Sequence, residues 1–245
     1  QGFSNANRQK NHLISMNNSL VKEYFRAIKE INPSAFVMEN VSMLRSDTHR
    51  FYESHKDNDE IDELIKRGHS IPKRMDTVIV ADCAFDGVDY QNIDNLDVDE
   101  ISLPESLCQL IVVLNKNKVN PRRLPNYMAK HAKEIVQQID SFANKIDAPT
   151  VAQQSIMNKL AKIKQAINAN DVPSCSDAME YIVKLQKMIS TIREIRQNEL
   201  IGAYDVTLTD SLYFSVNSYS VIDYINAILD NGYVQDGCTV NAEWY

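Results

Sequence analysis

Glycine is scarce in this sequence, and several common ligand-binding patterns are missing with it. The 245 residues include 6 glycines, about a third of the usual share. Neither G-x-G-x-x-G nor G-x-x-x-x-G-K-[ST] occurs, which excludes a self-contained glycine-rich nucleotide-binding loop. The longest mostly apolar run, residues 107–114, is far shorter than the ~18 residues that a membrane span needs, so we expect no membrane partner. No charged and then apolar leader is present. The chain begins with Gln1 rather than Met, and we expect a fragment of a longer protein.

Cysteine is sparse as well, and its spacing excludes the usual metal patterns. The four cysteines are Cys83, Cys108, Cys175 and Cys238. They form no C-x-x-C pair and no Cys/His cluster with zinc spacing, so no metal site is expected. Isolated cysteines in a chain of this length favour reduced thiols over a disulfide framework. We therefore expect a cytoplasmic protein.

The composition is that of a soluble globular chain, but its charge is segregated. Hydrophobic residues make up 44% and charged residues 24%, enough for one large domain or two small ones. Residues 53–106 carry 15 Asp/Glu against 5 Lys/Arg, whereas residues 121–200 carry 12 Lys/Arg against 8 Asp/Glu. The acidic stretch, residues 53–106, also fits an ordinary solvated surface without a binding role. The net charge of -7 does not exclude nucleic acid, because phosphate contacts depend on a local basic face.

The N-terminal part of the chain has the pattern of an α/β unit. A helix is predicted from Asn18 or Ser19 to just before Pro33. Its apolar positions are Leu20, Tyr24, Ile28 and Ile31. The apolar run 35–38 then predicts a strand buried on both faces of a parallel sheet. Glu39 and Asn40 follow it, at the edge where open α/β sheets bind ligands.

The C-terminal part repeats this helix-and-strand pattern. Ser218 or Ser220 is predicted to cap a helix, and Gly232 to end it. Its apolar positions are Val221, Ile222, Ile225, Ile228 and Leu229. Residues 233–240 are predicted to form a strand. The two ends of the chain are thus expected to belong to one sheet.

The middle of the chain has a different, helical texture. Apolar residues recur in steps of three and four in three successive segments, which predicts a three-helix bundle over about residues 124–200. These residues are Met128, Ala132, Ile135, Ile139, Phe142 and Ile146, then Ile156, Leu160, Ile163 and Ile167, then Ala178, Ile182, Leu185, Ile189 and Ile192. Ser174 and Asp177 have the spacing of a capping box for the third helix. Residues 77–80 predict a strand, and residues 106–114 fit a helix or a buried strand equally well.

Three stretches resemble the DNA (cytosine-5) methyltransferase family. Gln1-Gly2-Phe3-Ser4 is similar to the residues that follow the Pro-Cys nucleophile in the family's P-C-Q-x-F-S signature. Residues 32–41 are similar to the family's P-x-x-x-x-x-E-N-V. Residues 232–245 are similar to the strand that leads into N-A-x-x-Y-G-V-P-Q. The three stretches occur in the family's order.

The resemblance implies methyl transfer from S-adenosylmethionine to C5 of a cytosine flipped out of double-stranded DNA. A cysteine thiolate adds to C6, and Glu39 is implied to hydrogen-bond N3 and the exocyclic amine as the ring gains charge. Asn40 is implied to hold the local backbone and the glutamate. Ser4 and Arg8 are implied to contact phosphates from a loop that closes over DNA. Taken alone, Glu39 also fits a strand-end carboxylate paired with a nearby cation.

The sequence departs from the family's pattern at its two central motifs. The Pro-Cys pair and the F-x-G-x-G cofactor motif are not in this chain, and no cysteine follows a proline. We therefore expect the isolated chain to be inactive, with its cofactor-binding residues unknown. The predicted fold is α/β, with a partial Rossmann-like methyltransferase sheet from residues 1–45 and 213–245. Residues 46–212 are predicted to be a mainly helical insertion.

A second function stays open beside the enzyme. The helical insertion also fits a non-catalytic module that docks a protein or DNA. Only two or three strands of the family's sheet are predicted in this chain, and without the neighbouring strands their edges are left open. The fragment is therefore expected either to self-associate or to cover these edges with the insertion.

Overall fold

The structure is a computed structural model that describes residues 16–36, 50–207 and 210–230, with side chains from Leu20 onward. By their contacts the residues divide into two compact units. Unit 1 comprises Gln1–Val78, Glu194–Ala203 and Phe214–Tyr245, and unit 2 comprises Ile79–Arg193 and Tyr204–Tyr213. The predicted insertion at 46–212 does not coincide with either unit. That these residues are inserted into a catalytic domain stays a prediction.

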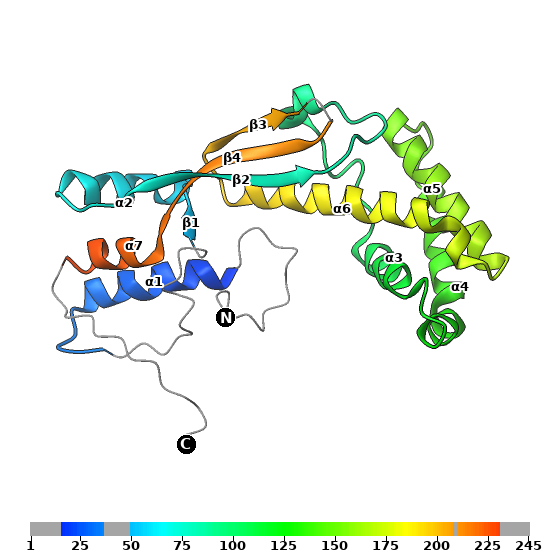
Figure 1. Cartoon of the computed structure of the whole chain (residues 1–245), viewed down its shortest axis with the longest axis horizontal. Helices are drawn as coiled ribbons and strands as arrows, with labels where there is room; N and C mark the ends of the chain where they lie inside the picture. Colours follow the sequence, from blue (N-terminus) through cyan, green and yellow to red (C-terminus); the bar gives the residue numbers. More distant parts are fainter. Residues whose placement is uncertain (1–15, 37–49, 208–209, 231–245) are drawn as a thin grey trace, which may run out of the picture. The chain divides into compact units, whose positions relative to one another are not determined.

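The described part of unit 1 contains the helices α1, α2 and α7 and part of a small sheet (Figure 1). The helices are α1 (Met16–Ile31), α2 (His55–Lys66) and α7 (Val221–Ile228). The strands are β1 (Arg50–Tyr52), β2 (Lys73–Ala81), β3 (Gly202–Val206) and β4 (Leu212–Ser220), of which β2, β3 and β4 also have residues in unit 2. The strand order is β1-β4-β2, and β3 also pairs with β4. β1 runs antiparallel to β4, with Phe51 opposite Tyr219.

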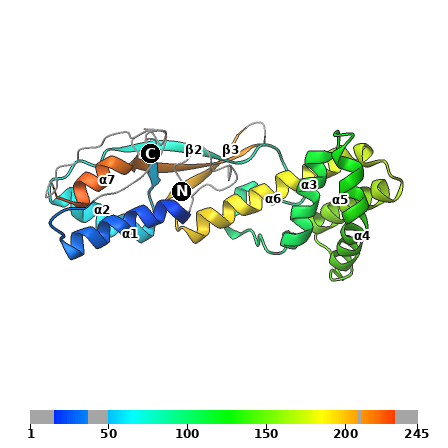
Figure 2. The same ribbon diagram turned by 90° about the horizontal axis from the view of Figure 1, so that it is seen from below.

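The core of unit 1 lies where α1 and α7 run side by side (Figures 1 and 2). α1 buries Val21, Phe25 and Ile28 there. Of the four apolar positions predicted from the sequence, Ile28 is buried, whereas Tyr24, Leu20 and Ile31 are 37%, 62% and 73% exposed. α1 has apolar residues on a wide arc, and its partners in the core select the side that is buried.

The ends of α1 and α7 differ in part from those predicted. α1 begins at Met16, two residues before Asn18, since a capping signal locates a helix end only to within a residue or two. It ends before Pro33 as predicted, with Asn32 in the left-handed region (φ 49°). Ser220 caps α7 as predicted, because its hydroxyl accepts a hydrogen bond from the Asp223 N–H. The left-handed residue after α7 is Asp230 (φ 52°).

The predicted parallel strands are not part of the described sheet. Ala35 and Phe36 have no strand structure. Residues 37–38, Gly232 and residues 233–240 lie outside the described residues. The described part of the chain is thus an α/β structure with a small antiparallel sheet and many helices. The partial Rossmann-like sheet stays a prediction.

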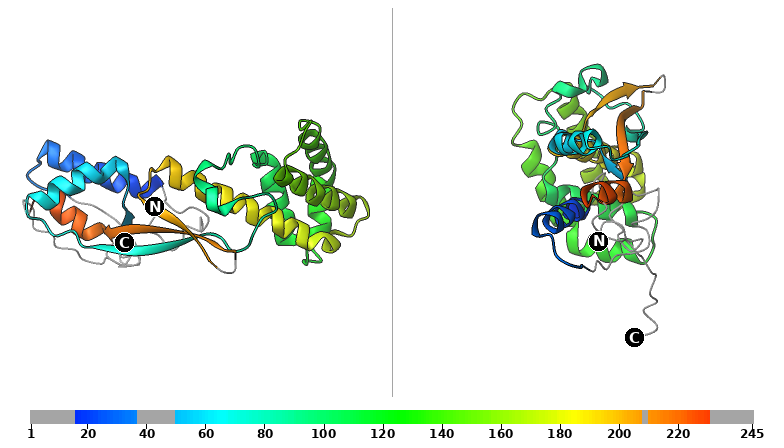
Figure 3. Two further views of the ribbon diagram at one scale, coloured as in Figure 1. Left: turned by 90° about the horizontal axis from the view of Figure 1, so that it is seen from above. Right: turned by 90° about the vertical axis from the view of Figure 1, so that its left-hand side faces the viewer.

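Unit 2 is built mainly from helices, which Figure 3 draws in green and yellow. They are α3 (Glu105–Asn117), α4 (Arg123–Ala143), α5 (Val151–Asn168) and α6 (Ser176–Gln197), whose last turn lies in unit 1. The three predicted helices are therefore confirmed. Their predicted stripes are buried except at Ala132 and Ile146, which are half-buried.

The segment that fitted both a helix and a strand is a helix, α3, which packs on α4. The Tyr127 hydroxyl donates to the Leu110 carbonyl at 2.9 Å, and the Ser106 hydroxyl donates to Gln138 at 2.9 Å. The predicted strand at 77–80 is confirmed as part of β2. Among its described elements, unit 2 thus includes α3, a helix that periodicity alone did not resolve.

The predicted cap of α6 is wrong. Ser174 lies within the 3-10 helix η3 (Val172–Cys175), and its hydroxyl donates to the Asp171 carbonyl instead of capping α6. The capping box that the structure contains is at α5, where Thr150 and Gln153 bond to each other's backbone N–H. The tight turn before α6 uses the hydroxyl that the sequence pattern assigned to the helix.

Candidate functional site

The four predicted site residues, Ser4, Arg8, Glu39 and Asn40, lie outside the described residues. The structure instead describes the elements that flank them. α1 lies between Arg8 and Glu39, and β1 begins ten residues after Asn40. The contacts of α1 and β1 therefore determine how the predicted site is anchored.

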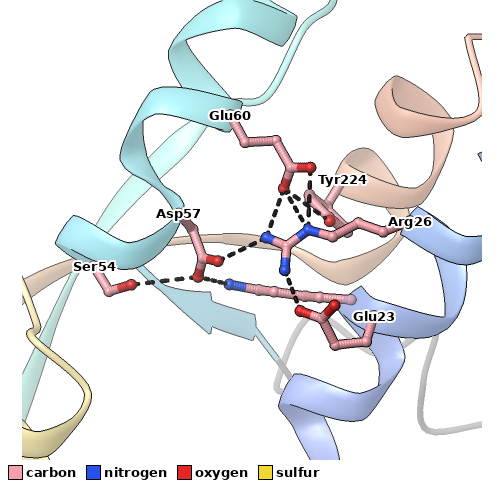
Figure 4. Close-up of polar contacts among 7 residues, drawn as sticks. Glu23, Arg26, Ser54, Asp57, Glu60 and Tyr224 are labelled. Atoms are coloured by element: carbon pink, nitrogen blue, oxygen red, sulfur yellow. Dashed lines mark hydrogen bonds and ion pairs between the residues drawn. The ribbon is translucent and has the colours of Figure 1, made fainter.

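A polar cluster joins α1 to α2 and α7 (Figure 4). The Arg26 guanidinium donates to Glu60 from Nε at 3.1 Å and from Nη2 at 2.8 Å, and also to Asp57 from Nη2 at 2.9 Å. Lys22, one helical turn before Arg26, donates to the same Asp57. The Tyr224 hydroxyl of α7 donates to Glu60 at 3.1 Å. We call Lys22, Arg26, Asp57, Glu60 and Tyr224 the α1 clamp.

Two further polar residues lie at the border of the α1 clamp. The Ser54 hydroxyl, immediately before α2, donates to Asp57 at 3.3 Å. Glu23 accepts from Arg26 on the exposed side of α1. The clamp and its border residues thus extend from Glu23, which is exposed to solvent, to Lys22, which is buried.

Lys22 is the most buried charged member of the α1 clamp. Its side chain is 9% exposed, and its ammonium lies 4.7 Å from the ring centroid of Phe51 and 5.4 Å from that of Tyr219. Aromatic faces stabilise a cation at such distances. Burial lowers the pKa of Lys22, and Asp57 opposes this shift only in part.

The carboxylate of Asp57 in the clamp is held as an anion. Burial on its own raises the pKa of Asp57, but Lys22 and Arg26 outweigh it, so that the pKa falls below its usual value. Burial also raises the pKa of the Tyr224 hydroxyl, which therefore stays a donor to Glu60. Because these groups satisfy one another, the clamp positions α1 and does not supply a free acid or base.

One buried hydroxyl beside the clamp is unsatisfied. Tyr219 is 0% exposed, and its hydroxyl has no hydrogen-bond partner among the residues that the structure describes. An unpaired buried hydroxyl costs about 1–3 kcal/mol. The aromatic ring, which packs against Phe51 and Tyr224, is thus the part of Tyr219 that stabilises unit 1.

A second polar network anchors β1, after the predicted site. Arg50 donates from Nε to the Ser218 hydroxyl at 2.8 Å and from Nη2 to the Ser218 carbonyl at 3.0 Å. The Ser218 hydroxyl in turn donates to Asp76 of β2 at 2.6 Å. The two elements that flank the predicted site residues in the sequence are therefore each held by polar contacts within unit 1, α1 by the α1 clamp and β1 by Arg50.

None of the clamp residues was predicted from the sequence. Lys22 and Arg26 are four residues apart on α1, and Asp57 and Glu60 are three apart on α2, so each pair lies on one helix face. That complementary spacing was the available signal. It was hidden because Asp57 and Glu60 lie in the acidic stretch that also fits a solvated surface.

Burial disfavours the thiolate form of the described cysteines, and the described acidic residues form no metal-binding group. Cys83, Cys108 and Cys175 are free, and burial raises the pKa of each thiol. Within residues 16–36, 50–207 and 210–230 no group of three or more His, Cys, Asp or Glu could hold a metal ion. No helix in the same ranges is long and apolar enough to cross a membrane.

The comparisons with known proteins bear on the same part of the chain. Residues 1–74 match the model of the family described as C-5 cytosine-specific DNA methylase. No curated protein and no solved structure matches the chain significantly. The matched segment includes the four predicted site residues and every clamp residue except Tyr224, and residues 232–245 lie beyond it. The resemblance to the DNA (cytosine-5) methyltransferases is therefore confirmed for the stretches at 1–4 and 32–41, which lie within the residues that match the family model.

Proposed function

We propose that this chain is part of an enzyme that transfers a methyl group from S-adenosylmethionine to C5 of cytosine in double-stranded DNA. The observation that carries the proposal is the family match over residues 1–74. It contains Ser4, Glu39 and Asn40 within the stretches that resemble the family's motifs, and Arg8 in the stretch that resembles the family's DNA-closing loop. The proposed substrate is a cytosine flipped out of the duplex.

Glu39 is the proposed proton donor to the base. Addition of a thiolate at C6 pushes electrons towards N3, and a carboxyl group at N3 stabilises this charge by donating a proton or a strong hydrogen bond. Asn40 holds the glutamate in place, and Ser4 and Arg8 contact the phosphates. The α1 clamp and the Arg50 network support this role, because they anchor the segment on both sides of Glu39.

The thiolate and the cofactor site are assigned to sequence outside this chain. The pKa of each described cysteine is raised by burial, which disfavours a thiolate. The carboxylates of the α1 clamp are paired with Lys22 and Arg26, so they do not fit a cofactor's polar groups. We accordingly propose that the isolated chain transfers no methyl group and does not bind S-adenosylmethionine.

The test is Glu39→Gln in a protein in which Pro-Cys precedes Gln1. Methyl transfer to duplex DNA should slow by roughly 10²–10⁴-fold, the span for losing a positioned acid–base group, while DNA binding is retained. Glu30→Gln, at an exposed position of α1, is the matched control. Turnover that equals the control's would show that Glu39 is a structural carboxylate.

The second candidate function is an interaction module, and one observation favours it for unit 2. The family match ends at residue 74, whereas unit 2 begins at Ile79. Unit 2 therefore lies wholly outside the matched segment. A docking role for the surface of unit 2 is therefore separate from the proposed catalytic role of residues 1–74.

A further inference from the structure

The exposed face of α4 carries five polar residues in a helical stripe. Their spacing is three, four, three and four residues, which places them on one side of the helix. They are Arg123, Asn126, Lys130, Lys133 and Gln137, and all five are exposed. The buried residues of α4 lie on the opposite side: Met128, Ile135, Ile139 and Phe142. We call the five exposed residues the α4 stripe.

The cations of the α4 stripe are not neutralised by carboxylates within the described ranges. The neighbouring acids have other partners: Glu134 lies 3.0 Å from His131 and accepts from Gln138, and Asp140 pairs with Lys164. Residues 106–133 contain six Lys/Arg and no Asp/Glu. The stripe is therefore a local basic surface on a chain whose net charge is -7.

Packing does not explain this arrangement of charge. Arg123 is the first residue of α4, and the first turn contains no acidic residue. A cation at the N-terminus of a helix opposes the helix dipole. The arrangement is unfavourable for the helix alone, and a bound anion would relieve it.

The chemistry of the α4 stripe fits duplex DNA better than other polyanions. It extends over 14 residue steps, about 21 Å at 1.5 Å per residue, and a duplex carries one negative charge per ~1.7 Å. Amide side chains such as Asn126 and Gln137 also bind phosphates and base edges. No member of the stripe is aromatic, whereas single-stranded nucleic acids are held by stacking on aromatic rings. Nor is any member a large apolar residue, which an anionic membrane surface would require as an anchor.

We propose that the α4 stripe contacts the phosphate backbone of duplex DNA. The proposal rests on the proposed function, which makes duplex DNA the substrate, and adds a contact surface outside the family-matched segment. Arg123, Lys130 and Lys133 supply the charge. Asn126 and Gln137 add hydrogen bonds along the same face.

The experiment measures binding of the 245-residue chain to a fluorescent 20-base-pair duplex by anisotropy between 50 and 200 mM salt. The stripe variant is Arg123→Gln/Lys130→Gln/Lys133→Gln. The control, Lys66→Gln/Lys162→Gln/Lys187→Gln, removes the same charge from exposed positions off α4. The plot of log affinity against log salt should be shallower by about 2–3 for the stripe variant, because each phosphate that a cation neutralises adds about 0.9 to the slope. Its affinity at 50 mM salt should fall at least about tenfold, whereas the control keeps the wild-type slope.

Several results would overturn the proposal. They are no binding by the wild-type chain at 50 mM salt, equal reductions in affinity for the two triple variants, or binding to phosphatidylserine vesicles without binding to the duplex. Circular dichroism checks that the helices are intact. If the triple variant does not fold, Lys130→Gln/Lys133→Gln gives the same comparison with an expected change in slope of about 2.

The outcome is independent of the Glu39 test. If the stripe variant binds DNA more weakly but Glu39→Gln turns over normally, the proposed catalytic role of Glu39 is contradicted. The proposed contact between the α4 stripe and DNA is then still supported. A slow Glu39→Gln enzyme whose stripe variant binds DNA normally would remove only the stripe proposal.

Discussion

Arg26 of α1 donates to both carboxylate oxygens of Glu60, which lies on α2 and 34 residues further along the chain. A guanidinium and a carboxylate joined by parallel hydrogen bonds fix orientation as well as distance. This pair therefore determines how α1 lies against α2.

Arg26→Met should destabilise unit 1. The substitution leaves Asp57 and Glu60 without their shared guanidinium while most of their surface remains buried. Because Arg26 itself is 31% exposed, we expect the free energy of unfolding to fall by about 2 kcal/mol, below the cost of breaking a fully buried pair. Urea unfolding followed by circular dichroism measures it. Glu23→Gln removes the exposed partner of Arg26 and should change the stability by less than about 0.5 kcal/mol. Equal effects of the two substitutions would contradict the clamp.

The free energy of unfolding of unit 1 should fall at acidic pH, because Asp57 becomes protonated. Its folded-state pKa lies below the usual value, so the stabilisation is fully present above the unfolded-state pKa, about 3.9. It is lost as the pH falls from there through the lowered pKa. Asp57→Asn should therefore make the free energy of unfolding less dependent on pH below about pH 4. Denaturant titrations between pH 6 and pH 2 measure the slope. An unchanged slope would mean that Asp57 is not held as an anion by Lys22 and Arg26.

Two neighbouring tyrosines should respond oppositely to removal of the hydroxyl. Tyr224→Phe removes a hydrogen bond to the Glu60 carboxylate and should cost about 1–2 kcal/mol. Tyr219→Phe removes a hydroxyl without a partner among the described residues, and should leave the stability unchanged or raise it. Thermal melts of the two variants compare them directly. A Tyr219→Phe variant that melts below the wild type would show that this hydroxyl is bonded after all.

Ile139→Asp should unfold the helical unit. The side chain is 3% exposed on the buried face of α4, and burying a carboxylate without a partner costs several kcal/mol, a large share of ordinary domain stability. Helical circular dichroism and the melting temperature are the measurements. Gln137→Asp introduces the same charge two residues away on the exposed face and should melt like the wild type. A normal melt for Ile139→Asp would contradict the assignment of this face to the core.

Local pattern was sufficient for α4, α5 and α6 of unit 2 and for the cap of α7. The stripes of α4, α5 and α6 repeat over many turns, and Ser220 bonds a backbone N–H three residues away. Both signals act within one element, so they can be read without knowing its partners. For the same reason the family resemblance could be recognised from short contiguous motifs around Ser4 and Glu39, and the family match over residues 1–74 confirms it.

Tertiary structure decided the features that depend on residues far apart in the chain. α1 has apolar side chains around both Leu20 and Val21, and packing against α7 and Phe51 determines that Val21 is buried. Charge pattern left Asp57 and Glu60 on a solvated surface, until folding brought Lys22 and Arg26 of α1 against them. The pattern of residues 106–114 fits a helix and a strand equally well, and the contacts of α3 with α4 select the helix. In each case the sequence supplied a side chain suited to several environments, and the desolvation and pairing available in the folded chain selected one.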